Sequence, residues 1–207
     1  AVTGLLLAFN LPPSLPTWMC VVGSLVAVVV AKQLFGGLGY NPFNPALVGR
    51  VFLLVSCPVA MTAAWSAWAV PGADAVTTAT PLGYVKTALT AGQPAPFVFD
   101  GAAAWAFFLG FKNGSLGEVS GLALLAGGLY LLWRRCISWH VPVSYLGTVA
   151  LLSGALWLWD PARNMSPLFH LLSGGLMLGA FFMATDMVTT PVTRSGLLLF
   201  GLGCGVL

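Results

Sequence analysis

Two asparagines, Asn41 and Asn44, alternate with prolines in the sequence Asn-Pro-Phe-Asn-Pro and have the chemistry of a polar binding site. Proline lacks an amide proton and interrupts helices, so backbone polar groups beside Pro42 and Pro45 lose their helical partners. Asparagine carries both hydrogen-bond donors and acceptors. In an apolar setting these groups suit an uncharged ring that forms hydrogen bonds. The alternative is helix capping, for which Asn is well suited, and both roles are compatible.

An acidic residue, Asp186, ends an apolar stretch and has threonines on both sides. An acid at a membrane boundary is costly unless it is hydrated, paired or functional. Thr185, Thr189 and Thr190 offer neutral oxygens of the kind that a hard cation such as sodium accepts. The sequence therefore supports either a functional role for Asp186 or an interfacial carboxylate that caps the next segment.

Glu118 precedes an apolar segment, where a carboxylate favours the start of a helix. We expect this capping role, with an ion path as the alternative. His140 and His170 do not stand at metal-ligand spacing, and we expect structural roles for both. The sequence has no Ser-His-Asp set, paired carboxylates or phosphate-binding glycine motif, so we expect no catalytic residues for hydrolysis and no nucleotide site.

A polar loop with several threonines, from Asp74 to Thr80, lies between strongly apolar segments. A loop outside the membrane leaves the hydroxyl of Thr80 accessible, and the small side chain of Ala79 leaves room beside it. Taken alone, the run Thr-Thr-Ala-Thr is more simply interpreted as a turn without modification. Whether Thr80 is modified has to be judged together with the other motifs of the chain.

The composition shows which solvent surrounds these residues. The chain has 207 residues, of which 58% are hydrophobic and only 6% charged. Soluble domains have about 25% charged residues, so the bilayer must be the solvent for much of this chain. The net charge of +3 comes from scattered bases, which argues against nucleic-acid binding.

The apolar segments predict an all-α, polytopic membrane protein made of a helical bundle. We expect residues 1–207 to form a single transmembrane domain, with an extracytoplasmic loop at 65–100. The chain begins at Ala1 inside an apolar run, and we expect it to be the middle of a longer subunit. Residues 101–111 are too short to span and predict a half-helix that enters and returns, as in broken-helix transporters. The stretches long enough to cross a bilayer are about 16–35, 45–64, 118–133, 142–159 and 167–185.

Loop charges predict the orientation of the bundle. Bases mark three loops that fall on one side if residues 101–117 do not cross the membrane. By the positive-inside rule that side is cytoplasmic, and the loop carrying Thr80 faces the periplasm of a Gram-negative cell. The bases are Lys32 and Arg50, Arg134 and Arg135, and Arg194.

Four motifs together resemble the RnfD family, the D subunits of the Rnf complex, which is homologous to the NqrB subunits of the sodium-pumping NADH:quinone oxidoreductase. The similarity extends over essentially the whole chain. The loop ending at Thr80 resembles the flavin-transferase motif D-x-x-[S/T]-G-A-T, with Thr78 where the family usually has Gly. The motifs are Gly36–Ala46, Asp74–Thr80, Ser138–Ser144 and Phe182–Asp186.

The resemblance implies two flavins and a cation path. FMN is expected as a covalent phosphoester on Thr80, within a motif to which Asp74, Thr77 and Ala79 belong. Non-covalent riboflavin is expected at Asn41 and Asn44, and Asp186 is expected to be a cytoplasmic ligand for sodium. The implied fold is related to that of urea transporters, with broken or re-entrant helices.

The implied function is electron transport by the membrane subunit of an ion-translocating ferredoxin:NAD oxidoreductase in the bacterial inner membrane. Expected partners are Rnf subunits A, B, C, E and G, with electrons exchanged with the flavin of the G subunit, and a flavin transferase for maturation. The subunit alone should have no turnover. One alternative is the NqrB subunit of the quinone reductase, which the Asn-Pro-Phe-Asn-Pro sequence and Thr78 disfavour. Another is a passive channel or transporter of the urea-transporter type, which has no reason to carry a flavin motif.

Overall fold

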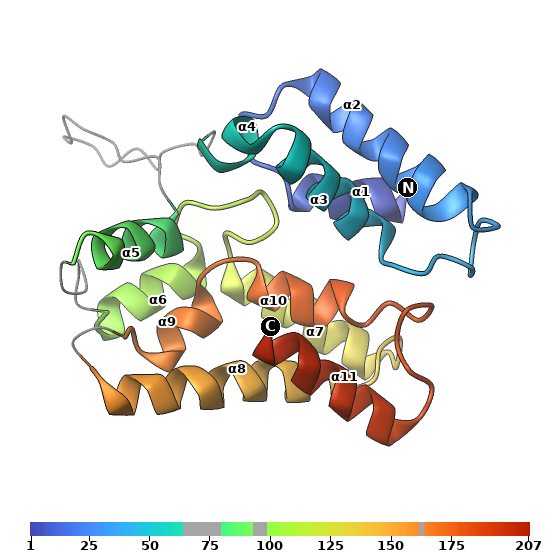
Figure 1. The fold of residues 1–207 in the computed structure, drawn as a ribbon. Helices are drawn as coiled ribbons and strands as arrows, with labels where there is room; N and C mark the ends of the chain where they lie inside the picture. Colours follow the sequence, from blue (N-terminus) through green and yellow to red (C-terminus); the bar gives the residue numbers. More distant parts are fainter. Residues whose placement is uncertain (64–79, 93–98, 162–163) are drawn as a thin grey trace.

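A computed structural model describes residues 1–63, 80–92, 99–161 and 164–207, which contain helices and no strands (Figure 1). The predicted all-α class is therefore confirmed for the described part of the chain. Its helices are α1 (Val2–Phe9), α2 (Thr17–Leu25), η1 (Val26–Gln33), α3 (Pro45–Ser56), α4 (Pro58–Ala63), α5 (Pro81–Thr90), α6 (Gly101–Leu109), α7 (Gly121–Trp133), α8 (His140–Trp159), α9 (Pro167–Leu172), α10 (Leu176–Leu178), η2 (Gly179–Met183) and α11 (Arg194–Val206).

The helices are shorter than the predicted spans. Among the described residues one helix, the 20-residue α8, is long and apolar enough to cross a membrane. The stretch predicted at 16–35 is one continuous helix, Thr17–Gln33, whose second half has π-helical hydrogen bonding. Residues 118–133 contain only the 13-residue α7. The predicted segment 65–100 is more than a loop, because it contains α5.

Two of the predicted spans are wrong as continuous helices. The first, 45–64, breaks at Cys57, which has non-helical dihedral angles and precedes Pro58. Proline restricts the residue before it, which explains this break. The second, 167–185, ends its first helix at Ser173, whose backbone is extended, and Gly174 follows with φ of +66°. That left-handed conformation favours glycine, so the sequence Ser-Gly-Gly interrupts the segment.

The helices form two groups with a region of short helices beside them (Figure 1). One group comprises α1, α2, η1, α3 and α4, and the other comprises α7, α8, α10, η2 and α11. The short helices α5, α6 and α9 gather at the end of the bundle near Thr80. Glycines allow close packing within the second group: a Cβ added at Gly205 of α11 would lie 2.7 Å from the Cβ of Thr148 on α8.

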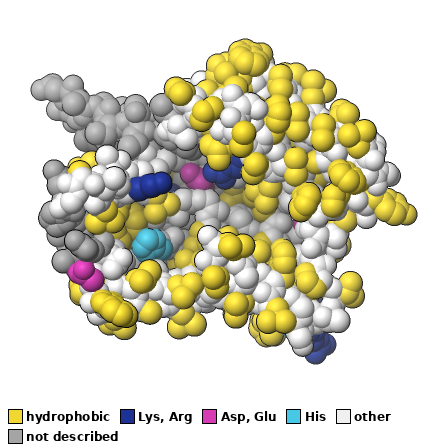
Figure 2. Space-filling model, in the orientation of Figure 1, with side chains coloured by type: hydrophobic (Ala, Val, Ile, Leu, Met, Phe, Trp, Pro, Cys, Tyr) yellow, Lys and Arg dark blue, Asp and Glu magenta, His cyan; other side chains and the backbone are white. Residues whose placement is uncertain are grey.

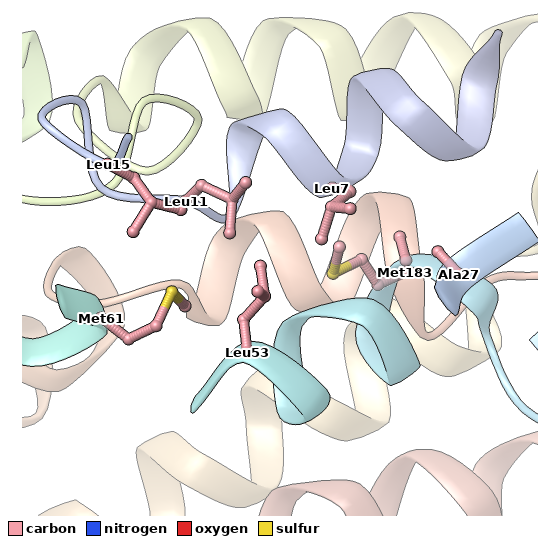
Figure 3. Packing of buried hydrophobic residues seen from close by; sticks show 8 residues of the cluster. Leu7, Leu11, Leu15, Ala27, Leu53, Met61 and Met183 are labelled. Carbon is pink, nitrogen blue, oxygen red and sulfur yellow. The ribbon is translucent and has the colours of Figure 1, made fainter. Parts of the chain in front are cut away.

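The first group is centred on a buried apolar cluster (Figure 3). Leu7 of α1 and Leu53 of α3 point toward each other, and Met183 at the end of η2 lies against them. Ala27 of η1 also belongs to the cluster, since α3 packs closely against that helix at Gly49. A Cβ added at Gly49 would lie 2.8 Å from the carbonyl oxygen of Gly23. The cluster therefore ties both helix groups together at the point where η2 ends.

We expect Gly49→Ala to destabilise the protein. Overpacking against a backbone atom costs about 1–3 kcal/mol. This outweighs the roughly 0.5–1 kcal/mol that Ala gains over Gly inside a helix. The measurement is the thermal unfolding midpoint in detergent, followed by tryptophan fluorescence. Gly203→Ala in α11 is the matched control, since nothing lies within 4 Å of its added Cβ. Equal midpoints for the two variants would contradict the close packing at Gly49.

Candidate functional site

Asn44 joins the start of α3 to the end of η2. Its side-chain oxygen accepts a hydrogen bond from the backbone N–H of Ala46 at 3.0 Å, which makes it the N-cap of α3. Pro45 occupies the first helical position, where its missing N–H is harmless. The Asn44 amide nitrogen donates to the carbonyl oxygen of Met183 at 3.2 Å. The predicted capping role is confirmed, and the same side chain bridges two segments 139 residues apart.

Asn41 is 6% exposed and pairs with Asp186, the other residue predicted from the sequence as part of a site. Its amide nitrogen donates to a carboxylate oxygen of Asp186 at 3.3 Å and to the carbonyl oxygen of Phe43 at 3.1 Å. The second carboxylate oxygen of Asp186 accepts from the backbone N–H of Val188 at 3.5 Å. Asp186 is thus paired with an amide, and it also holds the turn that follows it.

The threonines around Asp186 have different surroundings. Thr185 donates its hydroxyl proton to the carbonyl oxygen of Phe181 at 2.8 Å, and Thr190 donates to that of Asp186 at 2.9 Å. Their oxygens keep lone pairs for a further partner. Thr189 lines a cavity that also reaches Asn44. Of the three threonines, only Thr185 lines the cavity that contains Asp186.

Asn44 stands between two cavities. The larger, about 740 Å³, is lined mostly by apolar side chains, with polar groups from Asn10, Asn44, Arg50, Tyr145 and Thr189. The second, about 600 Å³, includes Lys32, Asn41, Asn44, Thr185 and Asp186. Apolar walls with a few placed polar groups are typical of small-molecule sites. Figure 2 shows one face hollowed between the two helix groups, with basic, acidic and histidine side chains among the hydrophobic ones.

Both π-helical segments border the second cavity. Lys32 belongs to η1, and Phe181 belongs to η2. π-helical turns interrupt the regular hydrogen-bond ladder and occur often at functional sites. Apolar composition alone could not reveal them, because they are defined by hydrogen bonding rather than by residue type.

Thr80 is the N-cap of α5. Its hydroxyl oxygen accepts a hydrogen bond from the backbone N–H of Gly83 at 3.2 Å, and Pro81 fills the first helical position. The side chain is half-buried. Asp74, Thr77 and Ala79, the other residues of the predicted motif, lie outside the described residues.

The helix that begins at Thr80 rests on the break after α9. A Cβ added at Gly174 would lie 2.8 Å from a methyl carbon of Leu82, so α5 touches this glycine. The next residue, Gly175, lines the larger cavity. The helix that Thr80 caps therefore contacts, through Leu82, the glycine that precedes a residue of the cavity wall.

Glu118 does not cap α7, and that prediction is wrong. The N-cap is Ser120, whose hydroxyl accepts from the backbone N–H of Ala123 at 3.2 Å. Glu118 is instead 5% exposed, and one of its oxygens accepts from the backbone N–H of Ser115 at 2.9 Å. Its other oxygen lies 3.0 Å from the position of a Cβ added at Gly175. The carboxylate therefore faces the break in the helix rather than the helix start.

Two polar side chains near Glu118, the half-buried Arg50 and the buried Lys112, were not predicted as site residues. Arg50, in the first half of α3, donates to the side-chain oxygen of Asn10 at 2.8 Å. Lys112 donates to the carbonyl oxygen of Leu172 at the end of α9. Burial lowers the pKa of Lys112 to about 8, and the negative charge of Glu118 opposes part of that shift. The sequence did contain one signal for Lys112, because this charged residue directly follows the predicted half-helix 101–111.

The histidines take part in ring packing. His140 stacks on Trp139 with ring centroids 4.1 Å apart, and His170 packs edge-on against Phe169. Within the described part of the chain, no three His, Cys, Asp or Glu residues cluster as metal ligands would.

These features define a class: a helical membrane protein in which polar and charged side chains meet where helices are interrupted, next to two cavities. The chain belongs to the NQR2, RnfD, RnfE family, which it matches over residues 1–207. The resemblance found in the four motifs is thereby confirmed.

Individual relatives resemble the chain over nearly its whole length. It is 49% identical over 205 residues to the D subunit of the proton-translocating ferredoxin:NAD(+) oxidoreductase complex of Clostridium ljungdahlii, covering 99% of this chain and 62% of the relative. It is 46% identical over 207 residues to the D subunit of the Na(+)-translocating complex of Acetobacterium woodii, covering 100% and 60%. It is 44% identical over 229 residues to the D subunit of the ion-translocating oxidoreductase complex of Stutzerimonas stutzeri, covering 99% and 64%. The chain spans about three fifths of the length of these relatives.

We expect Asn10→Ala to destabilise the protein by about 1–3 kcal/mol, because it leaves an Arg50 N–H without its partner in a buried setting. Asn10 is 2% exposed and also donates to the carbonyl oxygen of Leu6 at 2.7 Å. The measurement is again the unfolding midpoint in detergent. Asn164→Ala is the control, since that amide also donates to backbone carbonyls, at 3.0 and 3.1 Å, but from a side chain that is only half-buried. A larger loss for Asn164→Ala would contradict this account.

Proposed function

We propose that this chain is the membrane-embedded part of the D subunit of an ion-translocating ferredoxin:NAD oxidoreductase, the Rnf complex. It carries electrons on bound flavins and couples their passage to movement of Na⁺ or H⁺. The observation that carries the proposal is the match to D subunits of such complexes along the whole chain, at 44–49% identity. The chain is about equally similar to a relative named as proton-translocating and to one named as Na(+)-translocating, so these names do not indicate which ion is moved.

Thr80 fits a covalent FMN. A phosphoester at its hydroxyl would lie at the N-terminus of the ten-residue α5, where free N–H groups and the helix dipole favour a phosphate. The side chain is half-buried, so one side remains open to a transferase. We propose that Asp74, Thr77 and Ala79 complete the recognition motif.

Asn41 and Asn44 fit a non-covalent riboflavin. Each amide nitrogen has its described bonds to a carbonyl or carboxylate oxygen, which fixes the side chains at the boundary of the two cavities. The apolar walls exclude water, and a rigid amide edge can hydrogen-bond to a flat polar ring. A bound flavin supplies the electron transfer, while the chain positions it. We propose Asp186, held by Asn41, as a point on the cation path.

The interrupted helices support a urea-transporter-like fold with re-entrant segments. In this view α6 and the loop that follows form one half-helix hairpin, and α9 and α10 form another around the break at Gly174. Irregular backbone at membrane depth is tolerated where it is buried in protein. We propose that residues 1–207 form one transmembrane domain, with the segment 65–100 outside the cytoplasm.

The setting of the proposed subunit follows from the same assignment. We propose the bacterial inner membrane, with Thr80 on the periplasmic side. The proposed partners are Rnf subunits A, B, C, E and G, with the flavin of the G subunit as the electron-exchange partner of Thr80, and a flavin transferase for maturation. The proposed subunit alone is expected to have no turnover.

We expect Thr80→Val to abolish covalent flavin, because valine keeps the shape but has no hydroxyl to esterify. The measurement is flavin fluorescence of the subunit band on a denaturing gel of the complex, made in a host with a working flavin transferase. Thr87→Val is the matched control, since Thr87 is an exposed threonine on the same helix. A fluorescent Thr80→Val band would contradict the attachment site, and a dark wild-type band would contradict the flavin role.

A further inference from the structure

The loop between α6 and α7 contains a lysine buried deep in the protein. Lys112 is 7% exposed, and its ammonium donates to the carbonyl oxygen of Leu172, the last residue of α9. Lysine is almost never fully buried unless it is paired. The loop is held in place by backbone hydrogen bonds to the end of α1, including Gly117 N–H to the carbonyl oxygen of Phe9 at 2.8 Å. A lysine in such a fixed and buried position does not serve as a solvated surface charge, so another role must be sought for it.

Glu118 is the common neighbour of Lys112 and Arg50. Its negative charge acts directly on Lys112. Its outer oxygen and the Arg50 guanidinium converge on Gly175, at 3.0 and 3.7 Å from the same added Cβ position. Ser115 is completely buried beside it, and its hydroxyl has no hydrogen-bond partner among the described residues. The cluster therefore has a spare polar group in addition to its three charges.

The charged side chains in this cluster differ in how readily they gain or lose a proton. Arginine stays protonated in proteins, whereas a buried lysine loses its proton readily. Burial lowers the pKa of Lys112 to about 8 even though Glu118 opposes the shift. Helices α6 and α7 carry no acidic or basic residue, and α9 contributes only His170. Lys112 is thus the group whose charge can respond to a change in its surroundings.

The cluster is next to the larger cavity. Arg50 and Gly175 both line that cavity, together with Asn44. A negative charge that enters the cavity favours the protonated form of a nearby amine, and this effect is strong where water is scarce. The same wall is touched by α5, which begins at Thr80, through Leu82 and Gly174. The cluster therefore borders the cavity that Asn44 lines, and α5 contacts the glycine next to it.

We propose that Lys112 is a redox-linked proton site, which gains a proton when the flavin proposed at Asn44 is reduced in the cavity beside Arg50 and loses it when that flavin is reoxidised. The inference rests on the proposed function, since the flavin proposed at Asn44 takes up the electron and the other flavins of the complex supply it. The proton comes from water: an N–H bond forms on the neutral amine at uptake and breaks at release. Glu118 supplies the counter-charge, and the Leu172 carbonyl orients the ammonium. The site gives this protein a means of linking electron passage to proton movement.

The first test does not require a flavin. Since the pKa of Lys112 in the folded protein lies below its ordinary value of 10.5, the folded state binds fewer protons than the unfolded state between about pH 8 and 10.5. The stability of the wild type should therefore rise relative to that of Lys112→Met as the pH increases from about 8 to 10.5, because each step removes protons that favour the unfolded state. The measurement is the unfolding midpoint of both proteins in detergent from pH 7 to 10.5. Parallel curves would overturn the proposal, and Lys86→Met, at an exposed lysine of α5, should run parallel.

The second test measures the link to electrons. The midpoint potential of the flavins in the intact complex is titrated at several pH values, for wild type, Lys112→Met and Lys112→Arg. We expect wild type to show an additional fall in potential as pH rises above 8, and both variants to lose it. Lys112→Arg, which keeps its charge, should retain the higher potential, and Lys112→Met should have the lower one. An unchanged pH profile in both variants would overturn the proposal.

The two tests separate the failures. If the wild-type band carries no flavin, the proposed function fails, while the stability curves still report whether Lys112 titrates. If flavin is present and Lys112 titrates but the potentials of the variants follow the wild-type pH profile, the proposed function stands and the redox link fails.

Discussion

The structure depends on one constraint: inside a bilayer, each backbone polar group needs a partner within the protein. An unsatisfied group there costs several kcal/mol, so an interrupted helix survives only where other segments supply hydrogen bonds. In this chain the interruptions satisfy one another. The loop after α6 bonds to the end of α1, with Gly117 donating to the carbonyl oxygen of Phe9. Asn44 closes the start of α3 and reaches the end of η2.

This constraint explains where the polar chemistry lies. Side chains that satisfy the breaks must themselves be polar and buried, so they gather in the interior. Asn41 and Asn44 lie at one such place, and Lys112 and Glu118 at another. Because the same breaks leave room between half-helices, cavities form beside them. A binding site and a charge cluster thus share a single structural cause, and α5 contacts the break at Gly174 beside the charge cluster.

Local features of the fold followed from the sequence, and long-range ones did not. The Asn-Pro-Phe-Asn-Pro sequence predicted the cap at Asn44, because capping depends on neighbouring residues. The hydrogen bond from Asn41 to Asp186 joins residues 145 apart, and no local pattern encodes it. The predicted span at 45–64 failed at Pro58, which hydropathy alone does not register.

The charged residues show the same limit. The cap predicted at Glu118 is wrong because Ser120, two residues later, competes for the role and is closer to the helix start. The partner of Arg50 could not be predicted, because Asn10 lies 40 residues away in the chain. For Asp74, Thr77 and Ala79 the motif remains a prediction.

The central claim is that helix interruptions create an interior that holds flavins between Thr80 and Asn44. A density map of the intact complex by electron cryomicroscopy tests it most directly. The account predicts density continuous with the Thr80 hydroxyl oxygen and a flat, ring-shaped density against the Asn44 amide. A bare Thr80 side chain, with lipid or ordered water filling both cavities, would contradict it.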